Sequence, residues 1–143
     1  MPFHTVSQQV WAVYLAVIVA AALWRGGWAE RTAAVAAVVA NVASAALQDR
    51  TDWLDPQWGV LAVDILLLGV LAWIALRSSR YWPLFATAFQ LLGVITHVAM
   101  MVDRTVNPWA YITAGVIWSY LVMIPLAVGT WNCWRRRELS SVS

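Results

Sequence analysis

The chain has 143 residues, of which 62% are hydrophobic and only 11% are charged, whereas a typical soluble domain has roughly 25% charged residues. This composition excludes an ordinary water-soluble globular domain. All nine basic residues are arginines that occur as ones, twos and threes, so the chain has no basic stripe and nucleic-acid binding is not expected.

Five apolar stretches, joined by short links, are each close to the length of about 20 residues that crosses a bilayer as a helix. They cover residues 6–24, 32–48, 57–76, 82–102 and 109–131. Asp55-Pro56 and Asn107-Pro108 precede the third and fifth stretches as a capping residue followed by proline, a pattern typical of a helix start. We therefore predict an all-α integral membrane protein, in which a five-transmembrane-helix bundle forms a single domain over residues 1–143.

The second stretch consists almost entirely of Ala and Val, and its small residues recur every four positions. The two rows are Ala33, Ala37, Asn41 and Ala36, Ala40, Ser44. Such rows of small residues let neighbouring helix backbones approach closely. We expect this helix to be buried among the others, with Asn41 near its middle.

The arginines indicate the orientation, because cytoplasmic loops of membrane proteins carry an excess of basic residues. With five spans, one side has Arg25, Arg31, Arg77, Arg80, Arg135, Arg136 and Arg137, and the other has Arg50 and Arg104. If the Ala-rich stretch did not cross, the arginines would divide almost evenly. We predict a multi-pass protein of the cell inner (plasma) membrane with the N-terminus outside and the C-terminus in the cytoplasm. The last six residues, after Arg137, are expected to fray.

Most of the eleven tryptophans fall near the ends of the stretches, where an amphipathic ring favours the membrane–water interface. On the predicted cytoplasmic side these are Trp24, Trp28, Trp73, Trp82, Trp131 and Trp134, and on the outer side Trp53, Trp58 and Trp109. Only Trp11 and Trp118 lie away from a boundary.

Two ionisable residues lie within the apolar stretches, Asp64 and His97, and His97 is the only histidine there. At a rise of 1.5 Å per residue, both lie roughly 9 to 12 Å below the outer ends of their helices. An ionisable side chain at that depth is costly unless it finds a partner or water. We therefore predict that the two side chains face each other or share a hydrated pocket.

Further polar residues can complete such a pocket. Gln90, Gly93 and His97 share one face of the fourth helix by their spacing of three and four residues. On the fifth helix Thr113, Ile117 and Tyr120 recur in the same way. The candidate ligand-binding pocket, open to the outside, consists of Asn41, Asp64, Gln90, His97 and Tyr120.

Known catalytic signatures are missing from the sequence. The chain has no G-x-S-x-G, no H-E-x-x-H and no P-loop motif. His4 lies in the N-terminal tail and cannot face His97 across a haem, and no Cys, His and carboxylate residues have metal-ligand spacing. We expect no catalytic residue, no metal and no cofactor.

Two classes of function fit these observations. The favoured interpretation is an accessory or assembly subunit of a larger membrane complex, or a homo-oligomer, whose partners are the lipid bilayer and other protein subunits. The alternative is a self-contained binder or carrier of a small ligand or of protons, or a small membrane enzyme, which uses the level of Asp64 and His97. The polar residues can also serve packing alone, through hydrogen bonds between helices.

Overall fold

The computed structural model describes residues 6–47 and 58–142, and every regular element in them is an α-helix. The helices are α1 (Val6–Arg25), α2 (Trp28–Leu47), α3 (Trp58–Arg77), α4 (Trp82–Val102) and α5 (Pro108–Val142). All five are long and apolar enough to cross a membrane. The prediction of an all-α chain with five apolar helices is confirmed, whereas the predicted helix start at Asp55-Pro56 falls outside the described residues.

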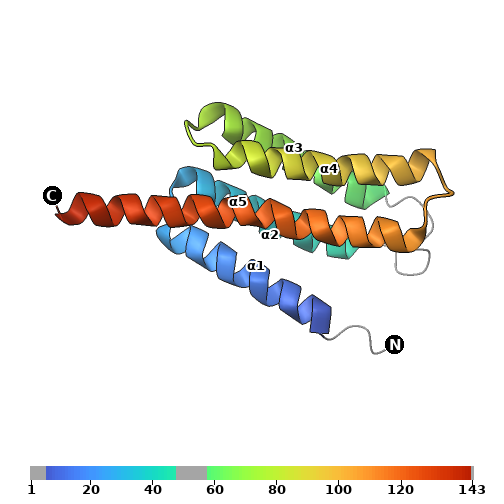
Figure 1. The fold of residues 1–143 in the computed structure, drawn as a ribbon, viewed down its shortest axis with the longest axis horizontal. Coiled ribbons are helices and arrows are strands. Elements are labelled where there is room, and N and C mark those ends of the chain that lie inside the picture. The colour runs from blue at the N-terminus through green and yellow to red at the C-terminus, as the bar shows by residue number, and fades with distance from the viewer. Residues whose placement is uncertain (1–5, 48–57, 143) are drawn as a thin grey trace.

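The five helices form a ring. Each helix packs against its neighbour in sequence, α1 and α5 pack against each other to close the ring, and α2 also touches α5 across the middle. In Figure 1, α5 runs the length of the molecule, with the α3 and α4 pair on one side and α1 on the other.

The link between α1 and α2 consists of two glycines and is very tight. The amide of Gly26 donates to the carbonyl oxygen of Ala22 at 2.9 Å, which continues α1 to its last turn. A Cβ atom on Gly26 would lie 2.5 Å from the Cβ of Glu30. Only glycine therefore lets the end of α1 approach the first turn of α2 so closely.

The start of α5 agrees with the sequence prediction. The side-chain oxygen of Asn107 accepts a hydrogen bond from the amide of Trp109 at 2.9 Å, and Pro108 is the first residue of the helix. This bond satisfies an amide that has no partner within the helix. The predicted cap is confirmed.

The end of α5 differs from the prediction, because the helix continues beyond residue 131, through the basic residues, to Val142 (Figure 1). Arg and Glu are good helix formers once the chain has left an apolar environment. In addition, Arg137 donates from Nη2 to the carbonyl oxygen of Gly26 at 3.4 Å, which ties this part of α5 to the α1–α2 turn. The expected fraying after Arg137 is therefore wrong for the described residues.

The Ala-rich helix α2 is enclosed on one face. The buried residues on this face are Ala29, Glu30, Ala33, Ala34, Ala37 and Ala40. Val35, Val39 and Val42 on the other face are exposed. The expected burial of this helix among the others thus holds for its small-residue face only.

The buried apolar residues are concentrated toward one end of the bundle. The buried apolar cluster is formed by Ile18, Val19, Ala22, Ala29, Ala33, Ala34, Ala37, Leu71, Ile74, Trp82, Ala86, Val122, Met123 and Leu126. Because successive helices alternate in direction, these residues gather toward the end that holds the α1–α2 and α3–α4 links, here called the turn end. The opposite end, which holds the α4–α5 link at residues 103–107, is called the loop end, and the residues of the predicted pocket lie toward it.

Candidate functional site

A cavity of about 440 Å³ lies in the loop-end half of the bundle, and all five helices contribute to its wall. Its volume falls within the range of roughly 300–1,000 Å³ that is typical of small-molecule sites. The five residues of the predicted pocket all line it: Asn41, Asp64, Gln90, His97 and Tyr120. They divide into two groups on its wall.

The first group is centred on the carboxylate of Asp64. Nε2 of His97 lies 2.9 Å from Oδ2 of Asp64, so the depth match predicted from the sequence corresponds to a direct contact. Gln90 donates from Nε2 to Oδ1 of Asp64 and to its backbone oxygen, both at 3.2 Å. The phenol oxygen of Tyr111 lies 2.6 Å from Nδ1 of His97. Helices α3, α4 and α5 are therefore joined by one chain of hydrogen bonds.

The donor and acceptor properties of the three groups fix the direction of each hydrogen bond between them. An ionised carboxylate only accepts, so Nε2 of His97 carries the proton shared with Asp64. In a neutral imidazole Nδ1 is then the acceptor, and the Tyr111 hydroxyl donates to it. If Nδ1 gains a proton, it becomes a donor, and the Tyr111 hydrogen must turn elsewhere. The chain Tyr111–His97–Asp64 can thus take up a proton at one defined atom.

The chain is enclosed but still accessible. The side chains of His97 and Asp64 keep 17% and 22% of their surface exposed. A carboxylate and an imidazole this far along apolar helices are stable because each has a partner. The remaining exposure lets water or a small molecule reach them.

The second group is centred on Asn41 of α2. Trp11 donates from its indole nitrogen to Oδ1 of Asn41 at 3.2 Å, and Asn41 donates from Nδ2 to the carbonyl oxygen of Ala37 at 2.9 Å. The rings of Trp11 and Tyr120 pack edge to face with centroids 4.8 Å apart. Asn41 and Tyr120 therefore belong to an aromatic wall of the cavity rather than to the Asp64 chain.

The row of residues on α5 that the sequence indicated lines the cavity only in part. Tyr120 lines it, whereas Thr113 and Ile117, which share its spacing, are exposed and are not among the lining residues. The lining face of α5 also carries Tyr111, Gly115 and Trp118, which are spaced by four and three residues. A helix has several faces with that spacing, so spacing alone does not fix its rotation.

One signal in the sequence does point to the cavity. Trp11 and Trp118 are the two tryptophans that lie away from the predicted membrane boundaries, and both line the cavity. Trp118 donates from its indole nitrogen to the hydroxyl of Thr96 at 3.0 Å. A buried indole needs such an acceptor, so a tryptophan in mid-span indicates a polar interior.

The chain was compared with protein-family models, with curated proteins and with solved structures. None of them matches. The function is therefore inferred from the cavity itself. In the part of the chain that the structure describes, no three His, Cys, Asp or Glu side chains gather in a way that would hold a metal ion.

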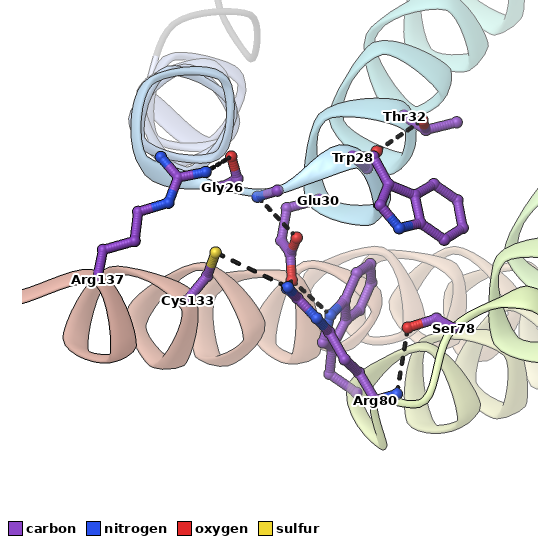
Figure 2. Close-up of polar contacts among 10 residues, drawn as sticks. Gly26, Trp28, Glu30, Thr32, Ser78, Arg80, Cys133 and Arg137 are labelled. Atoms are coloured by element: carbon purple, nitrogen blue, oxygen red, sulfur yellow. Dashed lines mark hydrogen bonds and ion pairs between the residues drawn. The ribbon is translucent and has the colours of Figure 1, made fainter. Parts of the chain in front are cut away.

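A second polar cluster, which the sequence analysis missed, lies at the turn end and is centred on Glu30 (Figure 2). The carboxylate of Glu30 is 0% exposed. It pairs with the guanidinium of Arg80 and accepts hydrogen bonds from the amide of Gly27 and from the indole nitrogen of Trp82, each at 2.9 Å. Arg80 also reaches Sγ of Cys133 on α5 at 3.9 Å. The cluster joins α2, α4, α5 and both tight turns.

The charges of this cluster compensate each other. Burial works to lower the pKa of Arg80, but the Glu30 carboxylate outweighs this effect and holds the pKa above its ordinary value. Trp82, which was predicted to lie near a membrane boundary, is only 6% exposed and packs within this cluster at the start of α4. With every oxygen of Glu30 occupied by donors of the chain, we assign this cluster a structural role.

Proposed function

We propose that this protein is a membrane-embedded binder or carrier of a small ligand, which enters the cavity from the loop end. The observation that carries this proposal is the hydrogen-bonded chain of Asp64, His97 and Tyr111 on the wall of a 440 Å³ cavity. Asp64 and His97 both keep exposed surface on the wall of this cavity, which a role in packing alone does not require.

The lining supports a ligand that is neutral or positively charged. Among the described residues, those that line the cavity include the carboxylate of Asp64, and none of them is an arginine or lysine. The rings of Trp11, Trp118 and Tyr120 offer faces that attract cations. A small organic amine therefore suits the site better than an anion, which would lie near the Asp64 carboxylate.

The same chain gives the protein a means of coupling binding to a proton. A proton that arrives from the ligand or from water is taken at Nδ1 of His97, because Nε2 already carries the proton shared with Asp64. Nδ1 then donates to the oxygen of Tyr111, and the Tyr111 hydroxyl turns its hydrogen toward the cavity. The cavity therefore presents the Tyr111 hydroxyl to the ligand as a hydrogen-bond donor when His97 is protonated, and it lacks this donor when His97 is neutral.

A ligand panel tests this function. We expect small amines to raise the melting temperature of the purified protein in mild detergent, and carboxylates of the same size to leave it unchanged. Asp64→Asn keeps the shape of the side chain but removes its charge, and should abolish the shift. Glu138→Gln, which removes an exposed carboxylate from the far end of α5, should preserve it.

The competing function is the accessory subunit. Its support is the outward-facing apolar residues of the helices, but lipid covers such residues as well as a partner protein does. A protein that co-purifies in fixed stoichiometry from the native membrane, together with no shift from any compound in the panel, would contradict the binder and support the subunit. Shifts that persist in Asp64→Asn would contradict the proposed site.

We also propose that the protein lies in the cell inner membrane with its loop end outside. The support is the arginine distribution, seven on the turn-end side against two on the other. Reporter fusions after Arg31 and Arg80 should report the cytoplasm, and fusions after Asp52 and Arg104 the outside. A cytoplasmic signal after Asp52 would contradict the five-span orientation.

A further inference from the structure

A second cavity, of about 410 Å³, is a groove between α4 and α5 in the turn-end half of the bundle. Here it is called the α4–α5 groove. One wall carries Tyr81, Phe85 and Phe89, each four residues after the last. The other wall carries Ile124, Val128, Asn132 and Arg136, again at intervals of four. Each wall is thus a single row of side chains along one helix.

Both rows change polarity in the same direction. Near the middle of the bundle's length both rows are apolar, with Phe89 on one wall and Ile124 on the other. Toward the turn end the α4 row finishes in the hydroxyl of Tyr81, and the α5 row passes through the amide of Asn132 to the guanidinium of Arg136. Gly129 lies between the rows, and the indole of Trp82 packs directly on it.

The dimensions of the groove match half of a bilayer. The row from Ile124 to Arg136 spans twelve helical steps, which is about 18 Å at 1.5 Å per residue. Half of the hydrocarbon core of a bilayer is about 15 Å. The cationic end of the row therefore lies at the level of lipid headgroups when its apolar end lies near the middle of the membrane.

The two arginines of the groove differ in their partners. Arg80 is already paired with Glu30. Arg136 is exposed, and no carboxylate of the described residues lies within ion-pair distance of it. The groove thus ends in one uncompensated positive charge that is available to a ligand.

From this arrangement we infer that the α4–α5 groove binds one anionic phospholipid of the leaflet at the turn end. The phosphate lies on Arg136, the ester region lies beside Asn132 and Tyr81, and an acyl chain follows Phe85 and Val128 toward the centre of the bundle. A free phosphate ion would use the guanidinium but would leave the apolar walls uncovered. This inference does not depend on the function proposed for the loop-end cavity.

Native mass spectrometry of the purified protein, loaded with equal amounts of phosphatidylglycerol and phosphatidylcholine, tests the inference. The protein should retain phosphatidylglycerol preferentially, and Arg136→Gln should reduce this retention about fivefold, the effect of one basic residue at a membrane surface. Arg135→Gln removes the same charge from the next residue, which does not line the groove, and should retain the lipid as the native chain does. Added inorganic phosphate should not displace it.

A second variant tests the apolar part of the groove. Val128→Trp fills the groove at a position that is 50% exposed, so the fold tolerates it, and it should reduce lipid retention even though every arginine is present. Equal losses in Arg136→Gln and Arg135→Gln would show attraction by surface charge alone and overturn the site. Equal retention of the two lipids by the native chain, or displacement by phosphate, would also overturn it.

Discussion

Replacing Arg80 with methionine should destabilise the bundle by about 3–5 kcal/mol, the usual cost of removing one partner of a buried ion pair. The carboxylate of Glu30 is 0% exposed, so water cannot replace the lost guanidinium. The amide of Gly27 and the indole of Trp82 still donate to it, but they do not neutralise its charge. The free energy of unfolding in mixed detergent micelles measures the effect.

Arg77→Met is the matched control for this experiment. Arg77 is exposed at the end of α3, and its replacement should change the free energy of unfolding by no more than about 0.5 kcal/mol. The double variant Glu30→Leu with Arg80→Met removes both charges and should recover part of the lost stability, since apolar residues often replace a buried pair without penalty. Equal stability of Arg80→Met and Arg77→Met would refute the structural role of the Glu30 cluster.

Gly129→Ala should also destabilise the protein, by about 1–3 kcal/mol, although alanine is the better helix former. A Cβ atom at this position would lie 2.5 Å from Nε1 and 2.6 Å from Cγ of Trp82. The indole has little freedom to move, because it is 6% exposed and donates to Glu30. The added methyl group therefore strains the same cluster from the opposite side.

Gly115→Ala on the same helix provides the comparison. A Cβ atom there would meet no atom within 4 Å, so this substitution should stabilise α5 by up to about 1 kcal/mol. Thermal unfolding of the two variants should thus shift in opposite directions. Shifts of the same sign and size would mean that Trp82 does not pack on Gly129 as described.

Depth within the bundle could be predicted from the sequence, because residue counts from polar helix ends convert directly into distance. This is why Asp64 and His97, identified as level with each other, prove to be in contact. Rotation of a helix about its axis could not be predicted in the same way. Tyr120 was the one residue of α5 predicted to line the pocket, and it does, but Tyr111 and Trp118 also line it, because only the packing of α5 on α4 and α1 decides which face turns inward.

The Glu30 cluster shows a second limit of prediction from the sequence. In the sequence Glu30 and Arg80 are polar residues near helix ends, which is where exposed polar residues are also found. Their pairing depends on the two tight turns meeting at one end of the ring, and residues fifty positions apart give no local sign of it. For Trp82 the sequence indicated the position along the helix, near a membrane boundary, but it gave no sign that the side chain is buried.

The closure of the ring by its first and last helices has a consequence for biosynthesis. The hydroxyl of Tyr14 on α1 donates to the carbonyl oxygen of Tyr120 on α5, across 106 residues of chain. During translation α1 is synthesised long before α5. The face of α1 that packs against α5 therefore lacks this contact until α5 has been inserted into the membrane. A nascent chain that stops after α4 therefore leaves the Tyr14 hydroxyl without its acceptor, whereas the indole of Trp11 keeps its acceptor Asn41 on α2.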